Sequence, residues 1–129
     1  MSLALIAAVV VHFLVAGFHG LAHQLVPVPL APWQMAFVAL VIVAAPPAGA
    51  WLVRQPASRV LGAAVVTLSM AASLAFGIVH HFVLVSPDNV WCVPDGPWQA
   101  SFVRSAWAVA ATEVAGTVAG ALAWYRWRR

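Results

Sequence analysis

Residues 2–24 read SLALIAAVVVHFLVAGFHGLAHQ, and this stretch decides the fold class because it contains no Asp, Glu, Lys or Arg. A helix rises about 1.5 Å per residue and crosses a hydrocarbon core of about 30 Å in roughly 20 residues. The stretch is therefore long enough to span a membrane. It lacks the charged start and the shorter apolar region of a signal peptide, so we expect a retained helix rather than a cleaved leader.

Three further apolar stretches of this length follow, at about 33–53, 59–85 and 101–125. Pro46 and Pro47 should kink the second one, because proline has no backbone N–H and its ring crowds the preceding turn. Residues 86–98, SPDNVWCVPDGPW, are rich in turn formers, so we expect a solvated outer loop there. The chain is thus predicted to be an all-α, four-helix transmembrane bundle that forms one domain over residues 1–129.

Composition supports a membrane protein and argues against a nucleic-acid partner. Hydrophobic residues make up 64% of the chain, against six basic and three acidic residues, which is too little charge to cover a soluble domain. Every basic residue is an arginine, and most of them flank the apolar stretches rather than forming a patch. The expected partners are the lipid bilayer and either other membrane subunits or further copies of the chain. Cys92 is the only cysteine, which excludes an intrachain disulfide and a cysteine-based metal motif.

Arginine placement predicts the orientation of the bundle. Asp88 and Asp95 lie in the outer loop, whereas five arginines fall on the opposite side of the expected membrane: Arg54, Arg59, Arg126, Arg128 and Arg129. Positive charge concentrates on the cytoplasmic side of membrane proteins. We therefore expect both termini in the cytoplasm, and the plasma (inner) membrane of a bacterium as the location.

Ionisable side chains inside the expected spans are the candidates for function. A charged side chain at the centre of a bilayer costs about 2.5–3.5 kcal/mol on insertion scales, so such groups usually face the bundle interior and perform a task. Three of them, His12, His19 and His23, fall within about 40° of one another on a helix that turns about 100° per residue. The first span is therefore predicted to present a histidine stripe.

The third and fourth spans supply possible partners for this stripe. His80 continues the small polar stripe of Ser69 and Ser73, whereas His81 is turned about 100° away from it on a regular helix. Side chains lean toward the N-terminus of their own helix. Because the fourth span runs in the opposite direction to the first and third, Glu113 should reach the depth of the histidines.

Together these residues predict one transition-metal ion near the outer leaflet. We expect His19, His23, His80 and Glu113 as ligands, with His12, His81 and Asp88 as lesser candidates. Three imidazoles and a carboxylate suit Cu, Fe, Zn or Mn. The function expected from such a site is that of a redox or metal-handling subunit within a larger membrane complex.

Several alternatives remain open at this stage. A b-type haem ligated by His19 and His80 would make the chain an electron-transfer subunit. Glu113 and the histidine stripe could instead form the relay of a proton-coupled carrier, or the chain could be a structural or assembly subunit. The sequence contains no phosphate-binding loop and no hydrolase motif, and it leaves open whether the chain is an enzyme.

Overall fold

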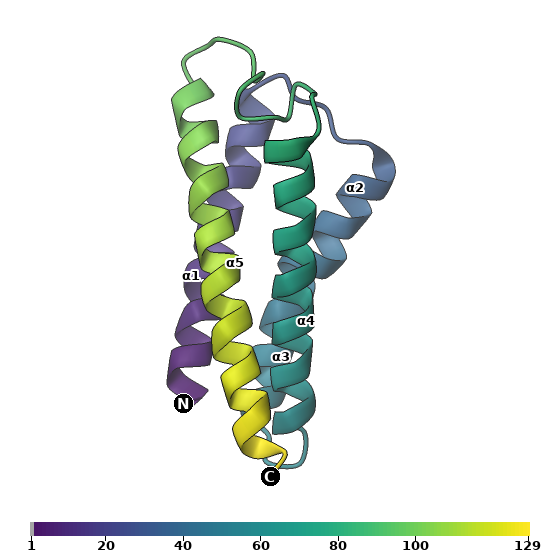
Figure 1. Cartoon of the computed structure of the whole chain (residues 1–129), viewed down its shortest axis with the longest axis vertical. Helices are drawn as coiled ribbons and strands as arrows, with labels where there is room; N and C mark the ends of the chain where they lie inside the picture. The colour runs from purple at the N-terminus through teal and green to yellow at the C-terminus, as the bar shows by residue number, and fades with distance from the viewer. Residues whose placement is uncertain (1) are drawn as a thin grey trace.

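The computed structural model describes residues 2–129, and all its secondary structure is helical (Figure 1). In chain order the elements are α1 (Ser2–Leu25), α2 (Pro32–Phe37), the π-helix η1 (Val38–Ala44), α3 (Ala45–Val53), α4 (Arg59–Ile78), the π-helix η2 (Val79–Val83) and α5 (Gln99–Trp127). Four helical stretches in the described residues are long and apolar enough to cross a membrane: Ser2–Leu25, Pro32–Val53, Arg59–Val83 and Gln99–Trp127. The four predicted spans are therefore present.

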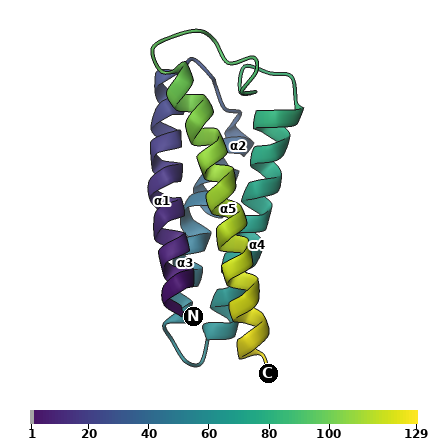
Figure 2. The ribbon, with the colours of Figure 1, turned by 60° about the vertical axis from the view of Figure 1, so that its left-hand side comes forward.

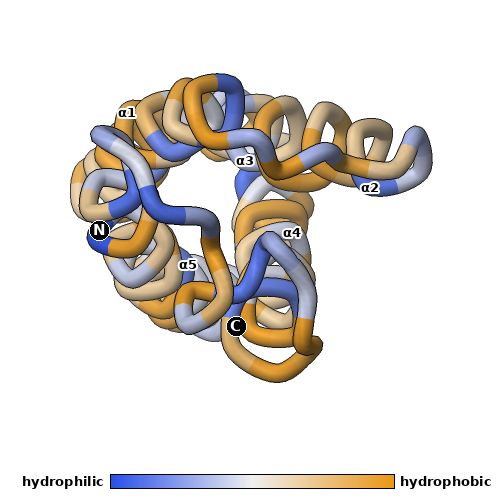
Figure 3. The backbone as a smooth tube through the Cα atoms, turned by 90° about the horizontal axis from the view of Figure 1, so that it is seen from above, coloured by the Kyte–Doolittle hydropathy of each residue, from blue (hydrophilic) through white to orange (hydrophobic). Residues whose placement is uncertain are grey.

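The two termini lie at the same end of the bundle, which we call the terminal end (Figures 1 and 2). The connections 26–31 and 84–98 lie at the opposite end, the loop end. Viewed along the bundle, α1, α3, α4 and α5 form a ring, and α2 extends outward from it (Figure 3). The second span therefore leaves the bundle as it approaches the loop end.

The bend in the second span follows from its two prolines. The carbonyl of Ile42 would accept from residue 46 in an α-helix or from residue 47 in a π-helix, and both residues are prolines without an N–H. The ring of His12 on α1 satisfies this carbonyl, with Nε2 lying 3.3 Å from the oxygen of Ile42. His12 is thus a packing residue that ties α1 to the bend, and its Nδ1 lies 3.2 Å from Oγ1 of Thr112 on α5.

Small residues allow the helices to approach closely at the terminal end. A Cβ atom built on Gly62 would lie 2.6 Å from the carbonyl oxygen of Gly49, so α3 and α4 are in backbone contact there. On α5, a Cβ on Gly120 would lie 2.5 Å from Oγ1 of Thr67. Such close contact supplies the van der Waals packing that holds helices together in lipid.

The connection 84–98 differs from the solvated loop that the sequence predicts. Asp88, Asn89, Val90 and Val93 are all buried, and the backbone N–H of Val90 donates to the carbonyl of His81. The two valines are buried at the loop end, where Val93 packs in an apolar cluster with Ala22, Val26, Val28 and Phe102. The expectation was wrong for residues 88–90 and Val93, which are buried against the end of the bundle, whereas Val85, Trp91 and Cys92 are exposed.

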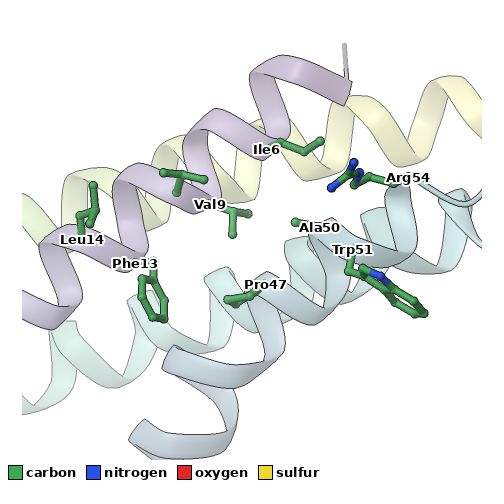
Figure 4. Close-up of a pocket in the computed structure, with 9 residues that line it drawn as sticks. Ile6, Val9, Phe13, Leu14, Pro47, Ala50, Trp51 and Arg54 are labelled. Atoms are coloured by element: carbon green, nitrogen blue, oxygen red, sulfur yellow. The ribbon is translucent and has the colours of Figure 1, made fainter.

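An apolar groove of about 350 Å³ lies between α1 and α3 (Figure 4). Phe13 and Leu14 line it from α1, Pro47 and Trp51 line it from α3, and Arg54 is its one charged lining residue. The first and second spans therefore do not close against each other along their whole length.

Candidate metal centre

Three histidines from two spans meet near the loop end. His19 and His23 lie one turn apart on α1, and His81 comes from η2. One ligand atom from each residue lies within 4.8 Å of the ligand atoms of the other two. The closest approach joins Nε2 of His19 to Nε2 of His81 at 3.2 Å. We call these three residues the histidine cluster.

The hydrogen bonds of His19 define which of its nitrogens is free. Its Nδ1 lies 2.8 Å from Oγ of Ser105 on α5, and the hydroxyl of Ser105 donates to the carbonyl of Phe102 at 3.0 Å. Since that hydroxyl has one hydrogen, its oxygen accepts from Nδ1 of His19. The Nε2 atom of neutral His19 therefore carries a lone pair, and this lone pair faces the cluster.

Asp88, a buried residue of the connection 84–98, lies against the other two rings. Nδ1 of His81 lies 3.0 Å from the backbone carbonyl of Asp88 and 3.1 Å from its Oδ1, so Nδ1 donates and Nε2 is left as the free nitrogen. Nε2 of His23 lies 3.4 Å from the same carboxylate oxygen. Nδ1 of His23 is buried without a hydrogen-bond partner among the described residues.

The charge state of Asp88 suits this role. Burial raises the pKa of the Asp88 carboxyl. The interaction with His81 and the positive charges that His81 and His23 can carry lower it by more, so the net pKa lies below the ordinary value. Asp88 is thus ionised at neutral pH and lies within ion-pair distance of both imidazoles. A carboxylate that holds the outer N–H of a histidine is the usual second partner in metal sites, where it fixes the tautomer of the ligand.

His80 does not join the cluster, which corrects the predicted order of the two adjacent histidines. Its Nδ1 accepts from Nε2 of Gln34 at 3.2 Å, and its ring contacts Trp33 and Phe76. His81 takes the inward position, and residues 79–83 form a π-helix, which turns less per residue than an α-helix and so brings residue 81 closer to the inward face than a regular helix would. The haem arrangement that needs His19 and His80 on one iron is therefore not supported.

Glu113 lies deeper than the cluster, in the same cavity. It is 1% exposed and is not among the residues whose ligand atoms group together. The cavity has a volume of about 380 Å³, and His19, His23, His81 and Asp88 also line it. The structure thus brings His19, His23, His81 and Asp88 together, keeps Glu113 apart in the same space, and places His12 and His80 elsewhere.

Ser105 is the participant that sequence reasoning missed. It lies on the buried face of α5, two turns before Glu113, and it is 4% exposed. A small polar residue on the same face as the intramembrane acid was the available signal. No family model, curated protein or solved structure matches this chain.

Proposed function

We propose that this chain is a small integral membrane protein that binds one transition-metal ion through His19, His23 and His81. The observation that carries the proposal is the set of free nitrogens. Nδ1 of His19 donates to Ser105 and Nδ1 of His81 donates to the carbonyl of Asp88, which leaves the Nε2 lone pair of each ring available. Nε2 of His23 lies beside the Asp88 carboxylate, and its Nδ1 has no hydrogen-bond partner among the described residues. This is the arrangement of histidines that ligate a metal and are oriented from behind.

The distances fit such an ion. Two nitrogens bound to zinc at about 2.1 Å in tetrahedral geometry lie about 3.4 Å apart. The pair His19–His81 has this spacing already, at 3.2 Å. The ligand atom of His23 needs to move only slightly to reach the same spacing, since all three ligand atoms lie within 4.8 Å of one another. Imidazole ligands suit Zn, Cu and Fe better than Mn, which prefers carboxylates.

A three-histidine site also leaves a coordination position for a further ligand. Catalytic metal sites have three protein ligands and an open position, whereas structural zinc sites are closed by four. Here the histidines line a cavity that can admit another molecule. This supports a reactive or exchanging metal, and hence a redox or metal-handling subunit of a membrane complex.

The placement of the site in the membrane belongs to the same proposal. The histidine cluster comes from the last turns of α1 and η2 before the loop end, whereas Arg54 and Arg59 flank the connection from α3 to α4 and Arg126, Arg128 and Arg129 end the chain, at the terminal end. With positive charge on the cytoplasmic side, both termini are cytoplasmic and the metal is near the outer leaflet of the plasma membrane. Cysteine accessibility of Cys92, which is exposed, tests this: a membrane-impermeant thiol reagent added outside intact cells should label it.

Elemental analysis of the purified protein tests metal binding, and the chain offers a matched pair of variants. His81→Ala removes a proposed ligand, whereas His80→Ala removes the adjacent histidine that bonds Gln34 instead. We expect one ion per chain in the wild type and in His80→Ala, and loss of the ion in His81→Ala. Cobalt loading should give a visible absorption band with the same dependence on the two variants.

A second function is favoured by the 3.2 Å contact itself, because a shared proton between His19 and His81 would give the same distance. The chain would then be a proton relay or a structural subunit, in line with its intramembrane acid. Absence of Zn, Cu and Fe from the wild type after incubation with each metal would overturn the metal proposal and leave this one.

A further inference from the structure

The cavity that the histidine cluster lines extends from the cluster toward the terminal end, and most of its wall is apolar. A metal ion needs only the polar part of this wall. Its volume of about 380 Å³ is in the range of pockets that hold small organic molecules. Below the cluster, apolar side chains make up most of the wall, among them Val38, Ile42, Phe76 and Val109. The space is therefore suited to a molecule with an apolar body.

Glu113 is the one acidic group in the deep part of this cavity. Both of its carboxyl oxygens are buried, and neither has a hydrogen-bond partner among residues 2–129. Its Oε2 lies near Gly77, where a Cβ would be 3.7 Å away, and Gly77 also lines the cavity. A buried carboxyl without a partner is costly, so this group is expected to bond something that enters the cavity.

The cavity reaches the lipid-facing surface between the first and second spans. Gly20 of α1 and Ala39 of η1 both line the cavity, and both are exposed. A Cβ built on Gly20 would meet nothing within 4 Å, so the wall is open at that point. On this side the bend of the second span carries α2 outward from the ring of helices (Figure 3).

From these features we infer that the cavity binds an uncharged, lipid-soluble molecule with a hydroxyl group, which enters from the bilayer beside Gly20 and bonds Glu113. A hydroxyl suits Glu113 whether the carboxyl is ionised or protonated, since it can donate and accept. An uncharged molecule avoids the cost of bringing a second charge into the membrane. This inference goes beyond metal binding and does not depend on it, because its anchor lies outside the histidine cluster.

A matched pair of probes tests the hydroxyl. The protein in phosphatidylcholine nanodiscs is titrated with para-nonylphenol or with its methyl ether, and native mass spectrometry counts the probe molecules that stay on the chain. We expect one phenol per chain and about tenfold weaker binding of the ether, the loss expected for one hydrogen bond. In Glu113→Leu the two probes should bind equally. Equal binding in the wild type would show that the cavity takes apolar molecules without regard to Glu113, and would overturn the inference.

A second pair of variants tests the entrance without touching Glu113. Gly20→Trp and Gly17→Trp both add a large side chain to α1 where a Cβ meets nothing within 4 Å, but only Gly20 lines the cavity. We expect Gly20→Trp to weaken phenol binding at least about tenfold and Gly17→Trp to leave it unchanged. Unchanged binding in Gly20→Trp would contradict the proposed entrance.

The metal content separates this inference from the proposed function. Removal of the metal from the wild type with a chelator should leave phenol binding in place, whereas Glu113→Leu should keep the metal, which also shows that this variant is folded. Phenol binding that fails in the wild type while the metal is present sinks only the cavity inference. Metal binding that fails while the phenol binds at Glu113 sinks only the metal proposal.

Discussion

Nε2 of His19 and Nε2 of His81 lie 3.2 Å apart, and in the neutral rings both atoms carry lone pairs. The other nitrogen of each ring donates, to Ser105 in one case and to Asp88 in the other. Two lone pairs at this distance repel each other unless a cation lies between them. The contact therefore requires either a proton or a metal ion between the two nitrogens. Ser105 and the carbonyl of Asp88 fix the orientation of the two rings.

Asp88→Asn should weaken metal binding without removing any ligand. Oδ1 of the carboxylate lies 3.1 Å from Nδ1 of His81 and 3.4 Å from Nε2 of His23, and loss of such partners typically costs about 10–100-fold in metal affinity. A titration against a competing chelator measures this change. Asp95→Asn is the control, because Asp95 lies in the same connection but is exposed and accepts from Gln99 at the start of α5. Equal affinities of the two variants would contradict the role given to Asp88.

The stability of the metal-free protein should depend on the ionisation of Asp88. Burial raises the pKa of this carboxyl, but the hydrogen bond and charge of His81 and the charge of His23 bring it below its ordinary value of 3.8. A group whose pKa is lowered on folding stabilises the protein above its unfolded pKa, and this contribution is lost as the pH falls through the folded pKa. We therefore expect the melting temperature in detergent to fall below about pH 4, and to fall less steeply in Asp88→Asn. Parallel curves for the two proteins would be evidence against this coupling.

Hydropathy and charge alone predict the four spans, because a membrane requires long apolar helices and tolerates few alternatives. The histidine stripe of α1 could also be predicted as far as His19 and His23, since that helix is regular over its whole length. Orientation relative to the membrane is a further inference from the arginines, which the fold itself does not test.

The choice between His80 and His81 could not be predicted in the same way. Projection at a constant angle per residue assumes an α-helix, and the π-helical turn at residues 79–83 breaks that assumption. Helical periodicity alone does not predict such a turn, because the sequence of residues 79–83 contains no Pro or Gly that would mark it. Glu113 is not among the residues whose ligand atoms group together, although its Oε2 and the ring of His81 both lie within 4 Å of the position that a Cβ on Gly77 would take.

Gly62→Ala should destabilise the bundle although it adds a single methyl group. The new Cβ would lie 2.6 Å from the carbonyl oxygen of Gly49 and 2.6 Å from the backbone nitrogen of Val53, and neither backbone atom can move aside cheaply. Overpacking of this kind costs about 1–3 kcal/mol. The measurement is the free energy of unfolding in SDS, with Gly17→Ala as the control because its Cβ meets open space. That control should be neutral or more stable, by up to about 1 kcal/mol, because alanine favours the helix.

His12→Leu should destabilise the bend in the second span and leave metal binding intact. His12 is buried and donates to the carbonyl of Ile42, which the two prolines deprive of a helical partner. Removing the donor should cost about 1–3 kcal/mol in the free energy of unfolding.

A double-mutant cycle with Pro46→Ala isolates this bond from the other contacts of His12. Alanine at position 46 restores an N–H that can donate to the carbonyl of Ile42 within the helix, so the carbonyl no longer depends on the imidazole. We expect the cost of His12→Leu to be smaller in the Pro46→Ala background than in the wild type, by about 1 kcal/mol. If the two costs are equal, the stability that His12 contributes comes from its contact with Thr112 and its packing, and the prolines are not the reason for a histidine at this position.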